Sequence, residues 1–290
     1  SPDIDSLLEQ TSRSFYLTLK VLPTKIRGQI GLLYLLARLA DTIADSASGN
    51  TNQLIDNIRE YNEYAQGNRD DPPNLSNLAQ LQTNPDEAKL LEKVSEVVSS
   101  LERFSDADQK KIRQCLDTIV SGQTLDLQRF GNVEKGIITP LSDDNELDDY
   151  TYRVAGCVGE FWTQMSLAHC INADEATEKL MFEYGVRFGK ALQLINILRD
   201  IPADLALGRC YIPIDSMTRY DLIPSDLQDL ENMENFRPLF DIYLDLAWGH
   251  LDAAVEYIGL LPKRQFRIRA ACMLPVLIGQ RTLTLLGSQN

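Results

Sequence analysis

Apolar residues recur along most of this chain at the spacing of amphipathic helices. Positions three and four apart share an apolar character in one segment after another, and no series alternates with the period of two that is typical of strands. We therefore expect an all-α fold. The pattern predicts helices over 4–20, 24–46, 53–66, 86–103, 107–128, 145–170, 174–201, 236–260 and 265–286.

The segments between these helices carry turn and helix-breaking residues. The longest irregular stretch, 66–86, holds three prolines, and 130–144 and 209–224 are further loops. None of these segments has the composition of a linker between domains, and no repeat of solenoid length occurs. We expect a single domain over residues 1–290.

Two of the predicted helices carry a stripe of polar side chains on an otherwise apolar surface. In the helix 24–46 the stripe consists of Tyr34, Arg38, Asp41 and Asp45. In the helix 174–201 and its immediate continuation the stripe consists of Gln193, Asn196, Asp200 and Asp204. The two helices thus present nearly the same arrangement of polar groups.

Each stripe ends in two aspartates four residues apart, a spacing that places both carboxylates on one helical face. Like charges on one face repel, and their burial is costly without a counter-charge. Mg²⁺ is a suitable counter-charge because it prefers oxygen ligands and keeps positions for water and phosphate oxygens. A single stripe is better explained by a solvated acidic face or by a buried network of ion pairs with Arg38 and Arg199. Two matching stripes favour a magnesium site that binds a diphosphate.

Composition excludes several other classes of protein. The formal net charge of −14 argues against nucleic-acid binding, which needs a basic face. Five scattered cysteines and two histidines form no zinc motif or disulfide framework, and they are typical of a reduced, cytoplasmic chain. No uncharged apolar run reaches the roughly 18 residues of a membrane span, and no signal peptide is visible.

At this point the residues resemble a known family, the squalene/phytoene synthases, which are head-to-head prenyl transferases. The resemblance rests on blocks that follow the family's order over most of the chain: Ser12–Tyr16, Tyr34–Asp45, Tyr150–Gly159, Gln193–Asp204 and Gly208–Pro213. It implies an isoprenoid-synthase-type helical fold around a central cavity. It also implies a magnesium-dependent reaction in which two farnesyl diphosphates form presqualene diphosphate, which then rearranges.

The resemblance also implies roles for individual residues. Asp41, Asp45, Asp200 and Asp204 match magnesium ligands, and Asn196 matches a ligand or its partner. Arg38, Arg199 and Arg209 match diphosphate contacts, as do Ser12 and Arg13. Tyr150 matches a tyrosine that assists proton handling, and Arg38, Asp41 and Asp200 complete the expected catalytic set. Cavity-lining positions are Phe15, Tyr34, Val154, Gly156, Gln193 and Tyr211, although core packing also explains the tyrosines. Close helix packing likewise explains Gly156 and Gly159.

Two positions depart from the family pattern. Ala44 stands where an acidic residue often precedes the last aspartate of the first motif. Pro202 lies inside the second motif, where proline removes a helical hydrogen bond and clashes with the preceding turn. We expect a kink or a helix end there, so the position of Asp204 is less securely predicted than that of Asp45.

Within the family, Leu35–Asp45 is more similar to squalene synthases, whereas Gly208–Pro213 is shared with phytoene and dehydrosqualene synthases. We expect squalene formed with NADPH, although no Rossmann-type glycine motif is present. The alternatives are dehydrosqualene, or phytoene from geranylgeranyl diphosphate, without NADPH. A non-catalytic isoprenoid-binding protein is the alternative from another class. Release of so apolar a product favours peripheral contact with a membrane, and the sequence does not predict an oligomeric state.

Overall fold

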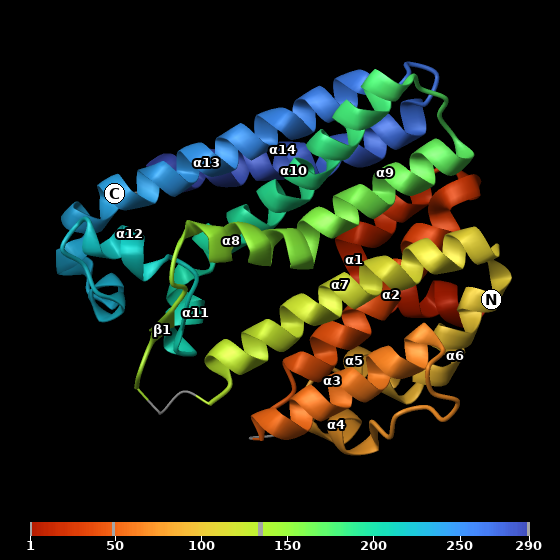
Figure 1. The fold of residues 1–290 in the computed structure, drawn as a ribbon, viewed down its shortest axis with the longest axis horizontal. Coiled ribbons are helices and arrows are strands. Elements are labelled where there is room, and N and C mark those ends of the chain that lie inside the picture. Colours follow the sequence, from red (N-terminus) through yellow and green to blue (C-terminus); the bar gives the residue numbers. More distant parts are fainter. Residues whose placement is uncertain (1, 48–49, 133–135, 289–290) are drawn as a thin grey trace. The chain divides into compact units, whose positions relative to one another are not determined.

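The structure, a computed structural model, describes residues 2–47, 50–132 and 136–288, with the side chains of residues 2, 3, 13 and 14 outside the description. The expected all-α class is confirmed, because helices make up nearly all of the regular structure in these ranges (Figure 1). The contacts between residues divide the chain into two compact units. Unit 1 consists of Ser1–Gly131, Phe161–Asn172 and Lys263–Ala271, and unit 2 of Asn132–Glu160, Ala173–Pro262 and Cys272–Asn290. The expectation of a single domain stays a prediction.

Unit 1 is built from helices that pack around α2. Its elements are α1 (Pro2–Val21), α2 (Thr24–Ala44), α3 (Thr51–Gln66), α4 (Ser76–Leu81), α5 (Pro85–Glu92), α6 (Val94–Ser99), the 3₁₀ turn η1 (Ser100–Arg103) and α7 (Asp106–Phe130). The later part of α9 (Cys157–His169) and the first residues of α14 (Phe266–Ser288) complete it.

Side-chain caps set the ends of several helices in unit 1. The Asn50 side chain accepts a hydrogen bond from the Gln53 backbone N–H at the start of α3, and Ser105 does the same for Asp108 at the start of α7. Gly67 ends α3 with a φ of 79°, a left-handed conformation that glycine adopts without steric cost. These signals lie in the local sequence, which is why both helices begin close to their predicted positions.

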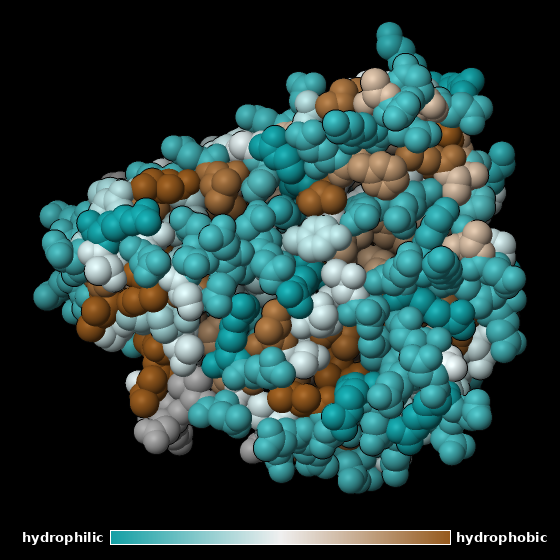
Figure 2. All heavy atoms as spheres, viewed as in Figure 1, coloured by the Kyte–Doolittle hydropathy of each residue, from teal (hydrophilic) through white to brown (hydrophobic). Residues whose placement is uncertain are grey.

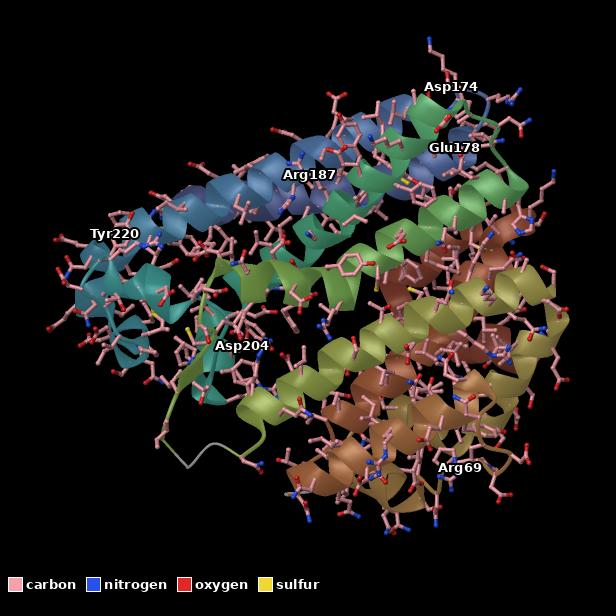
Figure 3. The ribbon with its side chains drawn as sticks, viewed as in Figure 1. Arg69, Asp174, Glu178, Arg187, Asp204 and Tyr220 are labelled. Carbon is pink, nitrogen blue, oxygen red and sulfur yellow. The ribbon has the colours of Figure 1, made fainter. Side chains whose placement is uncertain are left out.

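Unit 2 is dominated by two long helices that pack along each other, α10 (Glu175–Arg199) and α13 (Met233–Leu260) (Figure 1). Arg187 of α10 points toward α13 (Figure 3), where its guanidinium donates to His250 Nδ1 at 3.2 Å and to the Gly249 carbonyl at 2.7 Å. The remaining elements are β1 (Thr139–Pro140), α8 (Asp144–Thr151), the π-helical η2 (Tyr152–Gly156), α11 (Ile201–Ala206), β2 (Arg209–Cys210), α12 (Ile214–Thr218), η3 (Pro224–Gln228) and η4 (Leu230–Asn232).

Several predicted boundaries were wrong. The helix predicted over 86–103 consists of α5, α6 and η1, because the backbone leaves the helical region at Lys93 (φ −100°, ψ 18°). The predicted loop 66–86 contains α4, and the loop 209–224 contains α12 and the short strand β2, which pairs in parallel with β1. These elements are too short for periodicity to reveal them.

The last helix differs from the expectation in another way. By length and composition, α14 could cross a membrane: it has 23 residues and a window of mean hydropathy 1.3, and 28% of that window is buried. The sequence argument required a run without charged residues, and Arg281 interrupts that run. Elsewhere the face drawn in Figure 2 is mostly hydrophilic, in keeping with the net charge of −14.

Candidate functional site

The helix that carries the first polar stripe, α2, is buried on most of its surface. Leu35, Leu36 and Leu39 are fully buried, and α2 contacts α1, α3, α5, α6 and α7. The stripe is the part of the helix that retains some exposure: Arg38 and Asp41 are half-buried, and Asp45 at the C-cap is exposed. The apolar surface that flanks the stripe is therefore buried in the packing of unit 1.

Asp41 has a strongly shifted pKa. The pKa of its carboxyl is raised from 3.8 to about 6, chiefly by burial, and the charges of Asp45 and Glu87 act in the same direction. The side-chain amide of Gln123, on α7, donates a hydrogen bond to Asp41 Oδ1 and opposes this shift, as does the charge of Arg38. Among the side chains that the structure describes, the charge of Arg38 only partly offsets the cost of burying the Asp41 carboxylate.

The guanidinium of Arg38 has an ion-pair partner at Nη2 and, among the described residues, none at Nε. Its Nη2 group forms an ion pair with Glu87 of α5. Its Nε–H is buried and has no hydrogen-bond partner among the described residues. Because buried donors are almost always paired, this N–H is suited to an acceptor brought by a ligand.

The Ser12–Tyr16 block lies on α1. Tyr34 of α2 stacks on Phe15 with ring centroids 4.8 Å apart, and its hydroxyl donates to the Thr11 carbonyl at 3.2 Å. Ser12 is buried, and its hydroxyl donates to the Leu8 carbonyl. The side chain of Arg13 lies outside the described residues. Tyr34 and Phe15 therefore connect α1 to α2, and their expected role in lining a cavity stays a prediction.

The second stripe lies in unit 2, where the helix ends within the motif. The helix α10 ends at Arg199, and α11 begins at Ile201 with Pro202 in its first turn, where proline is well tolerated. The expected interruption at Pro202 is confirmed. The Asp204 N–H still donates to the Asp200 carbonyl at 2.9 Å, so the backbone keeps the spacing of one helical turn.

The side chains of the second stripe have the same range of exposure as those of the first, and the neighbouring Arg199 is exposed. Asn196 and Arg199 are exposed, and Gln193, Asp200 and Asp204 are half-buried. Arg199 holds Asp200 with two hydrogen bonds of 2.7 Å, from Nε to Oδ1 and from Nη2 to Oδ2. Asp200 therefore has a counter-charge from its neighbour in sequence.

The chain after α11 brings two tyrosines together. Gly208, with a φ of 76°, turns the backbone into β2, which contains Arg209 and pairs with β1. The next residue after β2, Tyr211, stacks on Tyr150 at the end of α8 with ring centroids 4.8 Å apart and hydroxyls 3.4 Å apart. Both tyrosines are buried.

Cys210 of β2 has a shifted pKa. The pKa of its thiol is raised to about 12, chiefly by burial, and the charge of Asp204 acts in the same direction.

The glycines of the third block are explained by helix packing. A Cβ on Gly159 would lie 1.8 Å from the Gly185 carbonyl oxygen of α10, and one on Gly189 would lie 2.1 Å from the Ala155 carbonyl oxygen. A Cβ on Gly156 would lie 3.3 Å from Val186. The η2 segment is π-helical, a form that often occurs at functional sites, and Val154 within it is half-buried. Substrate contact at Val154 and Gly156 stays a prediction.

The residues present fit magnesium when it binds together with a diphosphate. In the described part of the chain, no group of three or more His, Cys, Asp or Glu side chains could hold an ion alone. Each pair is thus a two-carboxylate donor set, and Mg²⁺ typically takes one or two carboxylates and fills its shell with water and phosphate oxygens. The raised pKa of Asp41 and the unpartnered Nε–H of Arg38 call for a cation and an anionic acceptor.

Sequence reasoning missed two residues of this site, Gln123 and Glu87. Both contact the first stripe from other helices of unit 1. Gln123 interrupts the apolar pattern of its helix and could have been noticed on that ground, whereas Glu87 lies in an ordinary acidic first turn.

Comparisons with known proteins found relatives both by sequence and by fold. A family profile described as squalene/phytoene synthase matches residues 8–290. The bifunctional lycopene cyclase/phytoene synthase of Podospora anserina is 29% identical over 263 residues, which cover 90% of this chain and 43% of that protein. The chain thus spans less than half the length of the curated relatives it matches.

Solved structures share the fold. A complex of TcSQS with the ligand E5700 matches with a TM-score of 0.78 at 20% identity, covering 98% of this chain and 78% of that one. The squalene synthase HpnC from Alicyclobacillus acidocaldarius matches with a TM-score of 0.69 at 17% identity, covering 98% and 91%. The chain therefore has the isoprenoid-synthase-type helical fold that the sequence predicts.

Proposed function

Because this chain belongs to the squalene/phytoene synthase family, we propose that it joins two farnesyl diphosphates head to head and forms squalene through presqualene diphosphate. The observation that carries the proposal is the first stripe. There, an aspartate whose pKa is raised to about 6 lies beside an arginine with a buried, unpartnered N–H. The Asp41 carboxylate favours a nearby cation, and the Arg38 Nε–H, which has no partner among the described residues, favours an anionic acceptor; a metal diphosphate supplies both. A scaffold that only binds isoprenoids would need neither group.

The protein groups divide the work of the first step. Asp41, Asp45, Asp200 and Asp204, with Asn196, would hold Mg²⁺, which when bound neutralises the charge that develops on a departing diphosphate. Arg38 would donate its Nε–H to a diphosphate oxygen, and Arg199 and Arg209 would add charge-assisted hydrogen bonds. As the allylic C–O bond breaks, these donors stabilise the leaving group, and the cation adds to the double bond of the second substrate.

Closure of the cyclopropane ring releases a proton, and we propose that Tyr150 relays it: the hydroxyl oxygen accepts this proton as the hydroxyl gives up its own, and the departed diphosphate is the final acceptor. The Tyr150 hydroxyl lies 3.4 Å from that of Tyr211, which orients it. Both rings are buried, so this exchange takes place out of contact with bulk water.

Phytoene is the second candidate product. The curated relatives named above are bifunctional lycopene cyclase/phytoene synthases, which favours twenty-carbon substrates and proton loss in place of reduction. The case for squalene rests on the similarity of Leu35–Asp45 to squalene synthases, and the case for NADPH rests on the same resemblance.

Product analysis by mass spectrometry separates these candidates. The protein is incubated with farnesyl or geranylgeranyl diphosphate and Mg²⁺, with and without NADPH. Squalene that forms only with NADPH supports the proposal. Phytoene, or one product regardless of NADPH, supports the second candidate. If neither substrate releases diphosphate in a metal-dependent manner, the chain is a binding protein and the proposed reaction is wrong.

A further inference from the structure

One face of α14 is apolar and exposed within unit 2. Five side chains of this helix are between 41% and 55% exposed. Their spacing places them on one arc of the helix surface. We call this arc the outer face of α14, and it consists of Met273, Leu274, Leu277, Ile278 and Leu285.

The charges of α14 differ from those of the chain as a whole. The helix contains no Asp or Glu, whereas the chain has 42 of these residues and a net charge of −14. Its charged residues are Arg267, Arg269 and Arg281. Arg267 and Arg269 lie in the part of α14 that belongs to unit 1, where Arg267 donates to the Val21 carbonyl, whereas Arg281 is exposed and falls within the arc of the outer face. An apolar arc with an exposed arginine and without carboxylates of its own helix is complementary to the apolar interior and anionic headgroups of a lipid bilayer.

The opposite face of α14 is committed to the interior of unit 2. Cys272, Val276 and Leu283 are buried, and a Cβ on Gly279 would lie 3.0 Å from Ile195 of α10 and 3.4 Å from Leu251 of α13. Arg237 of α13 donates to the Gly287 carbonyl at 2.7 Å and so holds the C-terminal end of the helix. A membrane-spanning α14 would lose these contacts.

We propose that the outer face of α14 docks unit 2 onto an anionic lipid bilayer, with the helix lying in the plane of the interface and its inner face still packed on α10 and α13. The protein then contacts the membrane through an amphipathic surface, in which the stem of Arg281 lies along the apolar region and its guanidinium reaches the headgroups. The docking itself does not depend on the reaction. Only its purpose, delivery of a hydrocarbon product to lipid, rests on the proposed function.

Vesicle flotation tests the proposal with the full chain. Vesicles of phosphatidylcholine alone are compared with vesicles that contain about one third phosphatidylglycerol. The protein is expected to float with the anionic vesicles, and salt is expected to weaken this binding. The double variant Leu277→Asp/Ile278→Asp is expected to bind the anionic vesicles at least about 10-fold more weakly, because it places two charges on the apolar arc. Arg281→Gln is expected to bind several-fold more weakly and to show a smaller salt dependence.

A matched control is Leu180→Asp on α10, an apolar side chain that is 38% exposed and lies outside the outer face. It is expected to bind vesicles like the unmodified protein, and circular dichroism of all variants confirms that they fold. Binding by Leu277→Asp/Ile278→Asp that equals that of the unmodified protein would overturn the proposal, as would an unmodified protein that ignores anionic vesicles. A dimer in light scattering that this double variant abolishes, without vesicle binding, assigns the face to a second copy instead.

Diphosphate release is measured on the same proteins in the absence of lipid. If release occurs but vesicles are not bound, the docking proposal fails and the proposed function stands. If vesicles are bound but no diphosphate is released, the docking proposal stands and the proposed function fails.

Discussion

The two aspartate pairs have the same spacing along the chain and lie in contrasting surroundings. Asp41 is enclosed by the helices of unit 1, and burial raises its pKa to about 6. Asp200 lies at a helix end in unit 2, partly exposed, with the Arg199 guanidinium bound to both of its oxygens. Among the described residues, the burial of Asp41 is therefore only partly compensated, whereas Asp200 is paired with its neighbour Arg199.

This difference indicates how each pair would respond to a metal diphosphate. At the first pair, a cation relieves a desolvated charge that the described side chains only partly offset. At the second pair, Arg199 must exchange its contact with Asp200 for one with the ligand, and exposed ion pairs of this kind are worth only about 0–1 kcal/mol. The sequence also allowed that a polar stripe is only an ion pair on a solvated helix face. This explanation fits Asp200, which is paired with Arg199, better than it fits Asp41, whose pKa is raised by burial.

The largest expected effect tests whether both pairs serve one reaction. Asp41→Asn and Asp200→Asn should each lower metal-dependent diphosphate release by about 100-fold or more, because each removes a charge that holds the cation. Asp56→Asn is a suitable control, since Asp56 is exposed and forms an ion pair with an arginine, Arg59, of its own helix. Full activity in either active-site variant would mean that the corresponding pair does not bind the metal.

The second prediction concerns the packing of α10, the helix that leads to the second pair. Gly159→Ala should destabilise the protein by about 3 kcal/mol or more, because its Cβ would overlap the Gly185 carbonyl oxygen. Gly259→Ala in α13 is the matched control. No atom lies within 4 Å of its Cβ position, so we expect a gain of up to about 1 kcal/mol. Thermal unfolding measures both, and equal stabilities would show that the close contact is absent in solution.

The third prediction uses the pKa of Asp41. Its pKa is higher in the folded protein than the ordinary 3.8, so ionised Asp41 lowers the free energy of unfolding as pH rises through about 6. Without metal at pH 8, Asp41→Asn should therefore stabilise the protein by about 2–3 kcal/mol. This gain should disappear near pH 4, where both forms are neutral, and Asp200→Asn should change stability by about 1 kcal/mol at most. A pH-independent effect of Asp41→Asn would contradict the desolvation argument.

A smaller effect is expected from the hydrogen bond that positions Asp41. Gln123→Leu removes the amide donor, so the carboxylate should lose its orientation and kcat/KM should fall by about 10-fold, with a higher Mg²⁺ concentration needed for half-maximal rate. Gln109→Leu, elsewhere on α7, serves as the control. A fall in kcat/KM with an unchanged Mg²⁺ requirement would show that Gln123 acts by some route other than Asp41.

The smallest effect concerns Glu87, whose carboxylate forms an ion pair with the guanidinium of Arg38 in the first stripe. Glu87→Gln should lower KM for the prenyl diphosphate by a few-fold, because it removes a carboxylate that competes with the diphosphate for the guanidinium. Steady-state kinetics at fixed Mg²⁺ measure the change. An increase in KM would instead indicate that Glu87 helps to hold the ligand.

The sequence by itself determined the helical class, the positions of the long helices and the two polar stripes, because each depends on local spacing. Asp41 and Asp45 share a face through the geometry of a single turn, and Pro202 interrupts the second helix through its own ring. The family resemblance likewise follows from motifs that can be read along the chain.

Only the tertiary structure decided which of these polar groups have partners. Gln123 is 82 residues from Asp41 and Glu87 is 49 residues from Arg38, so neither contact has a signal in local periodicity. The outer face of α14 is equally invisible in the sequence, where the helix is apolar nearly all round. Burial and charge pairing depend on which helices pack together, and for this reason one aspartate pair is desolvated while its counterpart is held by a neighbouring arginine.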